Sequence, residues 1–212
     1  MKTSEKGRFA LALKEGLVPA PYLDSVGVWT FGIGHAETSG IDPNPKSMPR
    51  GMPHDLDAAI RESFRLFART LEKYEADVRR AINVPMAQHE FDALVSFHYN
   101  TGGIARAALT RHLNNGDRAK SADAFMGWLR PPEIKGRRKA EQRLFMASVY
   151  PSGSIPVYSV TDSNKPGRII RRISEAEAMA YMAPDGPRVS RDGNPPSGLW
   201  ALLLRLFGGR AQ

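Results

Sequence analysis

The sequence predicts a mainly helical α+β protein with a small antiparallel sheet near its N-terminus. Apolar residues recur at spacings of three and four from Leu56 to Val78, which is the pattern of one long amphipathic helix. Every second residue from Trp29 to Ile33 is large and apolar, which is the period of a strand. Four shorter helical segments follow, beginning near residues 91, 105, 119 and 136.

The N-terminal elements are set by apolar spacing and by proline and glycine. Phe9, Leu13 and Leu17 predict a first helix that Pro19 and Pro21 end. Three glycines punctuate the strand that follows and predict a tightly turned sheet: Gly27, Gly32 and Gly34. Residues 37–53 are rich in Pro, Gly and Ser, so we expect an irregular loop there.

The chain divides into a main domain, residues 1–150, and a C-terminal extension, residues 151–212, whose role the sequence does not reveal. Pro151–Gly153 marks the predicted boundary. Within the main domain we expect two lobes and the long helix that joins them, with approximate ranges 1–55, 84–150 and 55–81 respectively.

The extension contains three predicted features. Ile155, Val157 and Val160 are spaced for a short strand, and Ser174 with Glu177 fits a capping box that opens a helix reaching about Met182. A Pro- and Gly-rich linker follows over residues 183–198. The apolar segment 199–207 docks on the main domain, binds a partner or makes weak contact with a membrane surface, and docking is the commonest fate of such a patch.

Composition limits the class of function. Lys and Arg outnumber Asp and Glu by 30 to 22, for a net charge of +8, which either attracts polyanions or only aids solubility. The basic residues form no long run, so we expect no nucleic-acid partner. There is no cysteine to form disulfides, and no histidine pair has a convincing spacing for metal ligands, so we expect neither metal nor cofactor.

We expect neither a transmembrane segment nor a signal peptide in this sequence. No apolar run approaches the roughly 20 residues that span a bilayer, and residues 1–14 lack the uninterrupted apolar stretch of a signal peptide. We therefore expect synthesis in the cytoplasm.

The residues that suggest chemistry lie between Glu15 and His35. Asp24 follows Glu15 by nine positions in the turn before the strand, and Thr30 follows Asp24 by six. Glycoside hydrolysis needs an acid to protonate the leaving oxygen and a carboxylate on the other side of the sugar. By spacing alone the pair is weak evidence, because most carboxylates of a chain this size are solvated surface charges.

Three blocks of sequence resemble the phage T4-type lysozyme family (glycoside hydrolase family 24). The first is residues 15–35, with the spacing E-x8-D-x5-T; the second is residues 91–102, and the third is residues 136–145. The resemblance covers about residues 5–150. It implies a lysozyme-like two-lobed fold with the cleft between the lobes, Glu15 as general acid, and Asp24 with Thr30 positioning the attacking water.

The resemblance also implies how these residues are tuned. We expect burial to raise the pKa of Glu15 so that it is protonated near neutral pH, while Asp24 stays ionised in a more polar setting. Lysozyme is a general example of two carboxylates whose different environments give them different roles. The family implies inversion, which requires carboxyl groups about 6.5–9.5 Å apart rather than about 5–5.5 Å.

Other polar residues have two interpretations each. His35 either braces the acid through a carboxylate partner or is an ordinary structural histidine. Asn100 and Thr101 either touch a sugar or cap a helix, and capping is favoured. A basic cluster near the end of the main domain either attracts anionic wall polymers or faces water: Arg137, Arg138, Lys139 and Arg143.

The leading function is therefore a monomeric endolysin that cleaves the β-1,4 bond between N-acetylmuramic acid and N-acetylglucosamine in bacterial peptidoglycan. Anionic envelope polymers are a second expected partner, because of the positive net charge. It acts at the wall or periplasm after release from the host cytoplasm. Two alternatives remain. A lytic transglycosylase needs only an acid, and Asp24 and Thr30 argue against it. A lysozyme-like wall-binding module of a phage particle or secretion apparatus is suggested by the extension.

Overall fold

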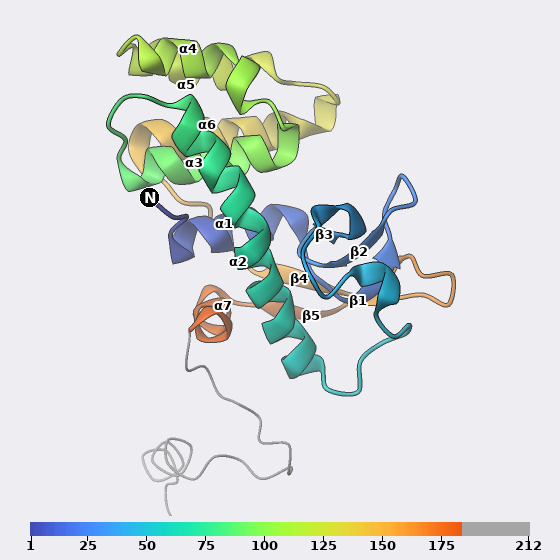
Figure 1. The fold of residues 1–212 in the computed structure, drawn as a ribbon. Coiled ribbons are helices and arrows are strands. Elements are labelled where there is room, and N and C mark those ends of the chain that lie inside the picture. Colours follow the sequence, from blue (N-terminus) through green and yellow to red (C-terminus); the bar gives the residue numbers. More distant parts are fainter. Residues whose placement is uncertain (184–212) are drawn as a thin grey trace, which may run out of the picture.

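The computed structural model describes residues 1–183, which form two lobes joined by the long helix α2 (Figure 1). The first lobe contains α1 (Glu5–Glu15) and a sheet of β1 (Val18–Leu23), β2 (Trp29–Gly32) and β3 (His35–Ala36). The second lobe is helical: α3 (Gln88–Thr101), α4 (Ala108–Asn114), α5 (Arg118–Ala124) and α6 (Lys135–Ala147). The last described elements are β4 (Ile155–Val160), β5 (Pro166–Ile173) and α7 (Glu175–Met182).

Helix α1 has well-defined ends that fix where Glu15 lies. Ser4 caps its N-terminus by accepting a hydrogen bond from the Gly7 amide. Gly16 ends it with φ +70°, a value that favours glycine because it has no Cβ. Glu15 is therefore the last helical residue. The helix ends before Leu17, which the apolar spacing places within it, because Gly16 stops it and Pro19 and Pro21 lie in β1 instead.

The three-stranded sheet has the order β1-β2-β3 with antiparallel neighbours. Tyr22 lies opposite Thr30, and an irregularity interrupts the pairing between Val18 and Tyr22. The predicted strand near residues 29–33 is confirmed by β2. Strand β1 was not predicted, because its two prolines resemble a helix stop rather than a strand.

Helix α2 (Leu56–Ala81) confirms the predicted long helix and carries much of the core. Its N-terminus is capped by Asp55, which accepts a hydrogen bond from the Ala58 amide at 2.8 Å. The apolar stripe at spacings of three and four is buried because sheet and helices pack on it: Ile60, Phe64, Phe67, Leu71 and Val78.

The helical lobe is built around α3, which packs against α6. The Phe97 ring on α3 meets the rings of Phe125 and Trp128 edge-on, with centroids 5.5 and 5.3 Å away. The hydroxyl of Tyr99 crosses to the first lobe and donates a hydrogen bond of 2.9 Å to the Ile33 carbonyl. This contact fixes the end of α3 against the sheet.

Residues 155–182 pack onto the first lobe. Three side chains of the β4–β5 hairpin and one of α7 are fully buried in the same core as α1 and α2: Ile155, Val157, Ile173 and Ala178. Strand β4 and the capping box of Ser174 with Glu177 confirm two predictions, whereas β5 was not predicted.

The division of the chain at residue 150 stays a prediction. The predicted linker lies outside the described residues beyond Ala183, and the whole apolar segment 199–207 does too. Within residues 1–183, every helix is too short or too polar to cross a membrane.

Candidate active site

Glu15 is held by an arginine from the other lobe. The carboxylate is 25% exposed, and its Oε1 atom accepts a 2.6 Å hydrogen bond from Nη1 of Arg137 on α6. The Arg137 side chain is only 9% exposed. A charge-assisted contact in such a shielded setting fixes the direction in which the carboxylate points.

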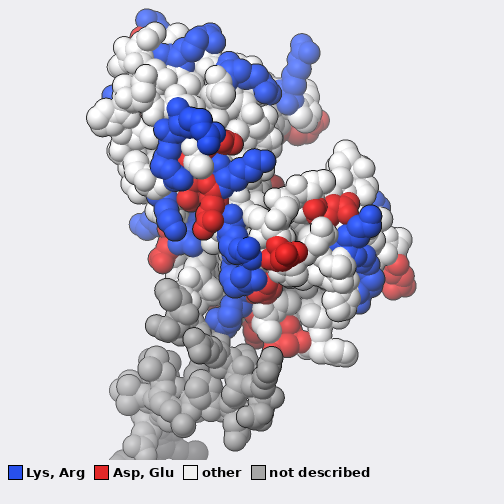
Figure 2. All heavy atoms as spheres, viewed as in Figure 1, with Lys and Arg blue, Asp and Glu red and all other residues white. Residues whose placement is uncertain are grey.

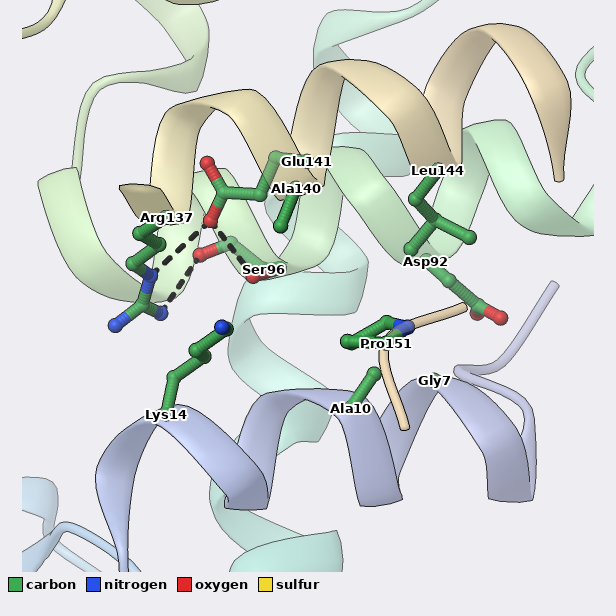
Figure 3. A pocket seen from close by; sticks show the side chains of 10 residues that line it. All are labelled: Gly7, Ala10, Lys14, Asp92, Ser96, Arg137, Ala140, Glu141, Leu144 and Pro151. Atoms are coloured by element: carbon green, nitrogen blue, oxygen red, sulfur yellow. Dashed lines mark hydrogen bonds and ion pairs between the residues drawn. The ribbon is translucent and has the colours of Figure 1, made fainter. Parts of the chain in front are cut away.

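Arg137 belongs to a buried network on α6 and α3. Its Nε atom donates to Oε1 of Glu141 at 3.1 Å, and the Ser96 hydroxyl donates to the same oxygen at 2.8 Å (Figure 3). Glu141 also pairs with Arg138, which reaches Asn100. Burial works to lower the pKa of Arg137, but the charges of Glu15 and Glu141 outweigh it and raise that pKa, so Arg137 stays charged.

This network corrects the expectation for the basic cluster. Arg137 and Arg138 neither face water nor offer their charge to a wall polymer, because Glu15, Glu141 and Asn100 occupy their donors. The relevant signal was Glu141 itself, which follows the two arginines by four and three positions on one helix. Lys139 and Arg143 are exposed, so for them both interpretations remain.

A cavity beside this network lies between α1 on one side and α3 with α6 on the other (Figure 3). It is lined by Lys14, Ser96, Arg137 and Glu141 among others. Its volume is about 20 Å³, which is room for one water molecule and not for a sugar ring. The cavity is therefore not a substrate site.

Asp24 is held by its own turn. Its Oδ1 atom accepts hydrogen bonds from the amides of Val26 and Val28, at 2.9 and 2.8 Å. Gly27 lies in this turn with φ +85°, which a residue with a side chain adopts only with strain. The carboxylate is partly exposed, and both of its bonds come from backbone groups within four residues.

Thr30 is tied to the same turn. Its side chain is in β2 and is 4% exposed, and its hydroxyl donates a 3.2 Å hydrogen bond to the carbonyl of Val28. That bond uses the hydroxyl proton and leaves the oxygen lone pairs available to accept a bond from water.

Tyrosine rings connect the two carboxylates electrostatically. Burial and the negative charges of Asp24 and Glu15, in that order, raise the pKa of Tyr22 to about 12. Burial, followed by the Glu15 charge, also raises the pKa values of Tyr99 and Tyr74. Since both carboxylates act on the Tyr22 phenol, Glu15 and Asp24 lie within electrostatic range of one group.

A comparison with known families matches this arrangement. The Phage lysozyme family matches residues 12–141, a span that includes Glu15, Asp24, Thr30 and Arg137. The chain belongs to the phage lysozyme family. The resemblance found in the sequence and the mainly helical α+β fold are thereby confirmed, while the narrower assignment to glycoside hydrolase family 24 stays a prediction.

Individual proteins similar to this phage lysozyme family member include endolysins and a muramidase domain. The endolysin of Salmonella phage P22 is 33% identical over 153 residues, which cover 69% of this chain and 99% of that one. The endolysin of Escherichia coli O157:H7 phage FAHEc1 is similar in structure, with a TM-score of 0.60, 32% identity, and coverage of 72% and 98%. The muramidase domain of SpmX from Asticaccaulis excentricus gives a TM-score of 0.56 at 25% identity, covering 69% and 98%.

The surface of this family member is indented between its two lobes (Figure 2). On the helical lobe, a hollow of about 420 Å³ is lined by residues that include Thr101, Trp128, Pro131 and Arg138. Arg138 shares Glu141 with the arginine that holds Glu15, so the hollow and the acid are joined by one chain of ion pairs.

The remaining candidates have structural roles. His35 is fully buried and its ring nitrogens contact the Thr70 hydroxyl and the Pro43 carbonyl. Of its two interpretations, the ordinary structural histidine is confirmed and the carboxylate partner was wrong. Thr101 bonds the Phe97 carbonyl and the Gly103 amide, which confirms capping for this residue. Asn100 instead accepts a hydrogen bond from Arg138, so capping was wrong for it. Among residues 1–183, no group of three or more His, Asp or Glu side chains is arranged so that it could hold a metal ion.

Proposed function

We propose that this protein is a lysozyme-type endolysin that hydrolyses the β-1,4 bond between N-acetylmuramic acid and N-acetylglucosamine in peptidoglycan. Glu15 is the general acid, and Asp24 with Thr30 holds the water. The observation that carries the proposal is the match of residues 12–141, which include Glu15, Asp24 and Thr30, to the phage lysozyme family. The charges of both carboxylates also contribute to the raised pKa of Tyr22.

The residues divide the reaction between them. Glu15 gives its proton to the glycosidic oxygen as the bond to the anomeric carbon breaks. A water held by the Thr30 oxygen and the Oδ2 atom of Asp24 attacks that carbon and passes a proton to Asp24. One water is consumed, one reducing end forms, and solvent returns each carboxyl to its starting state. Attack from the opposite side inverts the anomeric centre.

The hydrogen bonds described above support these roles. Both amide bonds to Asp24 go to Oδ1, which leaves Oδ2 for water. The Arg137 bond goes to Oε1 of Glu15, so we assign the proton of the acid form to Oε2. Each carboxyl therefore has one oxygen for anchoring and one for chemistry.

The same proposal specifies the partner of the protein and the place where it acts. The partner is peptidoglycan, and the net charge of +8 aids approach to anionic envelope polymers. We further propose that the protein is a monomer made in the host cytoplasm and that it acts at the wall after release.

The test is digestion of purified peptidoglycan, with products identified by chromatography and mass spectrometry. The wild-type protein should release new reducing muramic ends, and Glu15→Gln should lower the rate by roughly 100-fold or more. Glu72→Gln, at an exposed position of α2, is the matched control and should retain full activity. Unchanged activity in Glu15→Gln contradicts the assignment of the acid.

The same assay separates the alternatives. Products that lack one water and carry an anhydro end would identify a lytic transglycosylase instead. Sedimentation of the protein with wall sacculi that stay intact would identify a binding module.

A further inference from the structure

The β4–β5 hairpin lies outside the family match, which ends at residue 141, yet it borders the candidate active site. Its first strand pairs with the residue that follows α1 by two positions. The Leu17 amide donates to the Pro156 carbonyl at 3.0 Å, and the Tyr158 amide donates to the Leu17 carbonyl at 2.8 Å. The hairpin therefore contacts the chain immediately after Glu15.

The tip of the hairpin reaches the other carboxylate. The Leu23 amide donates a 2.7 Å bond to the Asn164 carbonyl, and Nζ of Lys165 lies 3.2 Å from the Asp24 carbonyl oxygen. One hairpin thus bonds both ends of the segment that runs from Glu15 to Asp24.

Packing at Gly16 strengthens the first of these contacts. A Cβ atom at Gly16 would lie 2.8 Å from the Tyr158 ring, so the ring lies directly against the peptide that follows Glu15. Only glycine allows this approach, and its φ of +70° gives a second reason for that residue.

Strand β1 has few other bonds along this segment. It pairs with β2 only at Val18, Tyr22 and Leu23, and Pro19 and Pro21 have no amide proton to donate. The hairpin supplies partners for the Leu17 amide and carbonyl and for the Leu23 amide. These bonds define where β1 begins and ends.

The hairpin itself is firmly anchored. Ile155, Val157 and Ile173 are fully buried. Arg171 binds Asp57 at the start of α2 with a distance of 2.8 Å, and the Tyr181 ring of α7 stacks on Phe64 of α2. A hairpin fixed to the long helix can transmit that rigidity to β1.

We propose that the β4–β5 hairpin is a brace that fixes the position of the Asp24 turn relative to Glu15, with Asn164 and Lys165 as positioning residues. The proposal rests on the proposed function. Two carboxyl groups that act on opposite sides of one sugar must keep their spacing, and a shift of about 1 Å costs up to roughly 100-fold in rate. The brace acts on the backbone of Asp24 and touches no substrate.

The main test shortens the hairpin tip. Because Val160 pairs with Pro166, residues 161–165 can be replaced by Asn-Gly, a two-residue turn that suits a hairpin. This variant loses both tip contacts and keeps the pairing at Leu17. We expect kcat to fall about 10-fold while KM changes less than about twofold. A drop explained by the unfolded fraction, or an unchanged kcat, would overturn the proposal.

A point variant isolates the lysine. Lys165→Met should lower kcat about threefold, and Lys165→Arg should restore it because a guanidinium can also donate to the Asp24 carbonyl. Arg168→Met, at an exposed cation on the same hairpin, is the control and should have no effect on kcat. Equal losses from the Lys165 and Arg168 substitutions would contradict a positioning role.

Amide hydrogen exchange without substrate tests the brace independently of activity. The Leu23 amide should exchange about 10-fold faster in the tip variant, while the Leu17 amide keeps its protection. Unchanged exchange at Leu23 overturns the brace. If the wild-type protein cleaves no peptidoglycan, the proposed function fails, and the exchange result still decides whether the hairpin holds the Asp24 turn.

Discussion

The two candidate carboxylates are held in opposite ways. Glu15 receives its bond from the side chain of Arg137, which is 122 residues away on the helical lobe and is itself held by Glu141. Asp24 receives both of its bonds from backbone amides of its own turn, and a hairpin within the same lobe holds that turn from outside.

This difference separates two kinds of dependence. The direction of the Glu15 carboxyl depends on how the two lobes fit together, whereas the direction of the Asp24 carboxyl depends on a local turn. Changes at the contact between lobes should therefore disturb the acid and leave the water-positioning group in place. Changes in the turn should do the reverse.

The largest effect should come from Arg137→Met. The substitution leaves the buried Glu141 with Arg138 as its one charged partner and removes the partner of Glu15, so the free energy of unfolding should drop by about 3–5 kcal/mol. Urea denaturation measures this, and Lys139→Met, at an exposed position of the same helix, should change stability by less than about 0.5 kcal/mol. Similar losses in both variants would show that the ion network does not stabilise the lobe.

Asp24→Asn should separate charge from turn geometry. The asparagine oxygen still accepts from the amides of Val26 and Val28, so thermal stability should change little, whereas peptidoglycan hydrolysis should fall roughly 100-fold. Asp24→Ala also loses both hydrogen bonds from the amides and should cost a further ~1–2 kcal/mol of stability. If Asp24→Asn kept full activity, the charge of Asp24 would have no part in the reaction.

Much of the fold was predictable because the signals were local. The stripe on α2 and the capping box of Ser174 with Glu177 each depend on residues within a few turns of one helix. The strands β1 and β5 were missed for different reasons. Prolines mask β1, and β5 buries only Ile173, so its side chains show no alternation of polar and apolar residues.

The candidate site was less predictable, because its key contact joins distant parts of the chain. Glu15, Asp24 and Thr30 could be named from a resemblance, but no local pattern links Glu15 to Arg137. The contact of Lys165 with the Asp24 backbone is equally non-local and lies outside the family match.

Gly34→Ala tests the contact between the lobes with a smaller effect. A Cβ atom there would clash with the Tyr99 hydroxyl and would displace it from its bond to the Ile33 carbonyl. Gly40→Ala is the matched control, since φ is +71° against +73° at Gly34 and nothing lies within 4 Å of its Cβ. The backbone strain cancels, and Gly34→Ala should be less stable than the control by roughly 1–3 kcal/mol in thermal denaturation. Equal stability would show that the tyrosine bond is dispensable.

The smallest effect sharpens the comparison of the two carboxylates, because it detects both with one probe. Both negative charges disfavour a phenolate, so Asp24→Asn and Glu15→Gln should each lower the pKa of Tyr22 from about 12 toward 10.0. Asp24→Asn should shift it further, because Asp24 is the stronger of the two charges. In the wild-type protein the folded state keeps this proton more tightly than the unfolded state, so the associated stability is complete below pH 10 and is lost as the pH rises through 12. Titration of the tyrosine carbon resonances by NMR measures each pKa. If Glu15→Gln left the pKa of Tyr22 unchanged, the acid would lie outside the electrostatic range of the Asp24 turn.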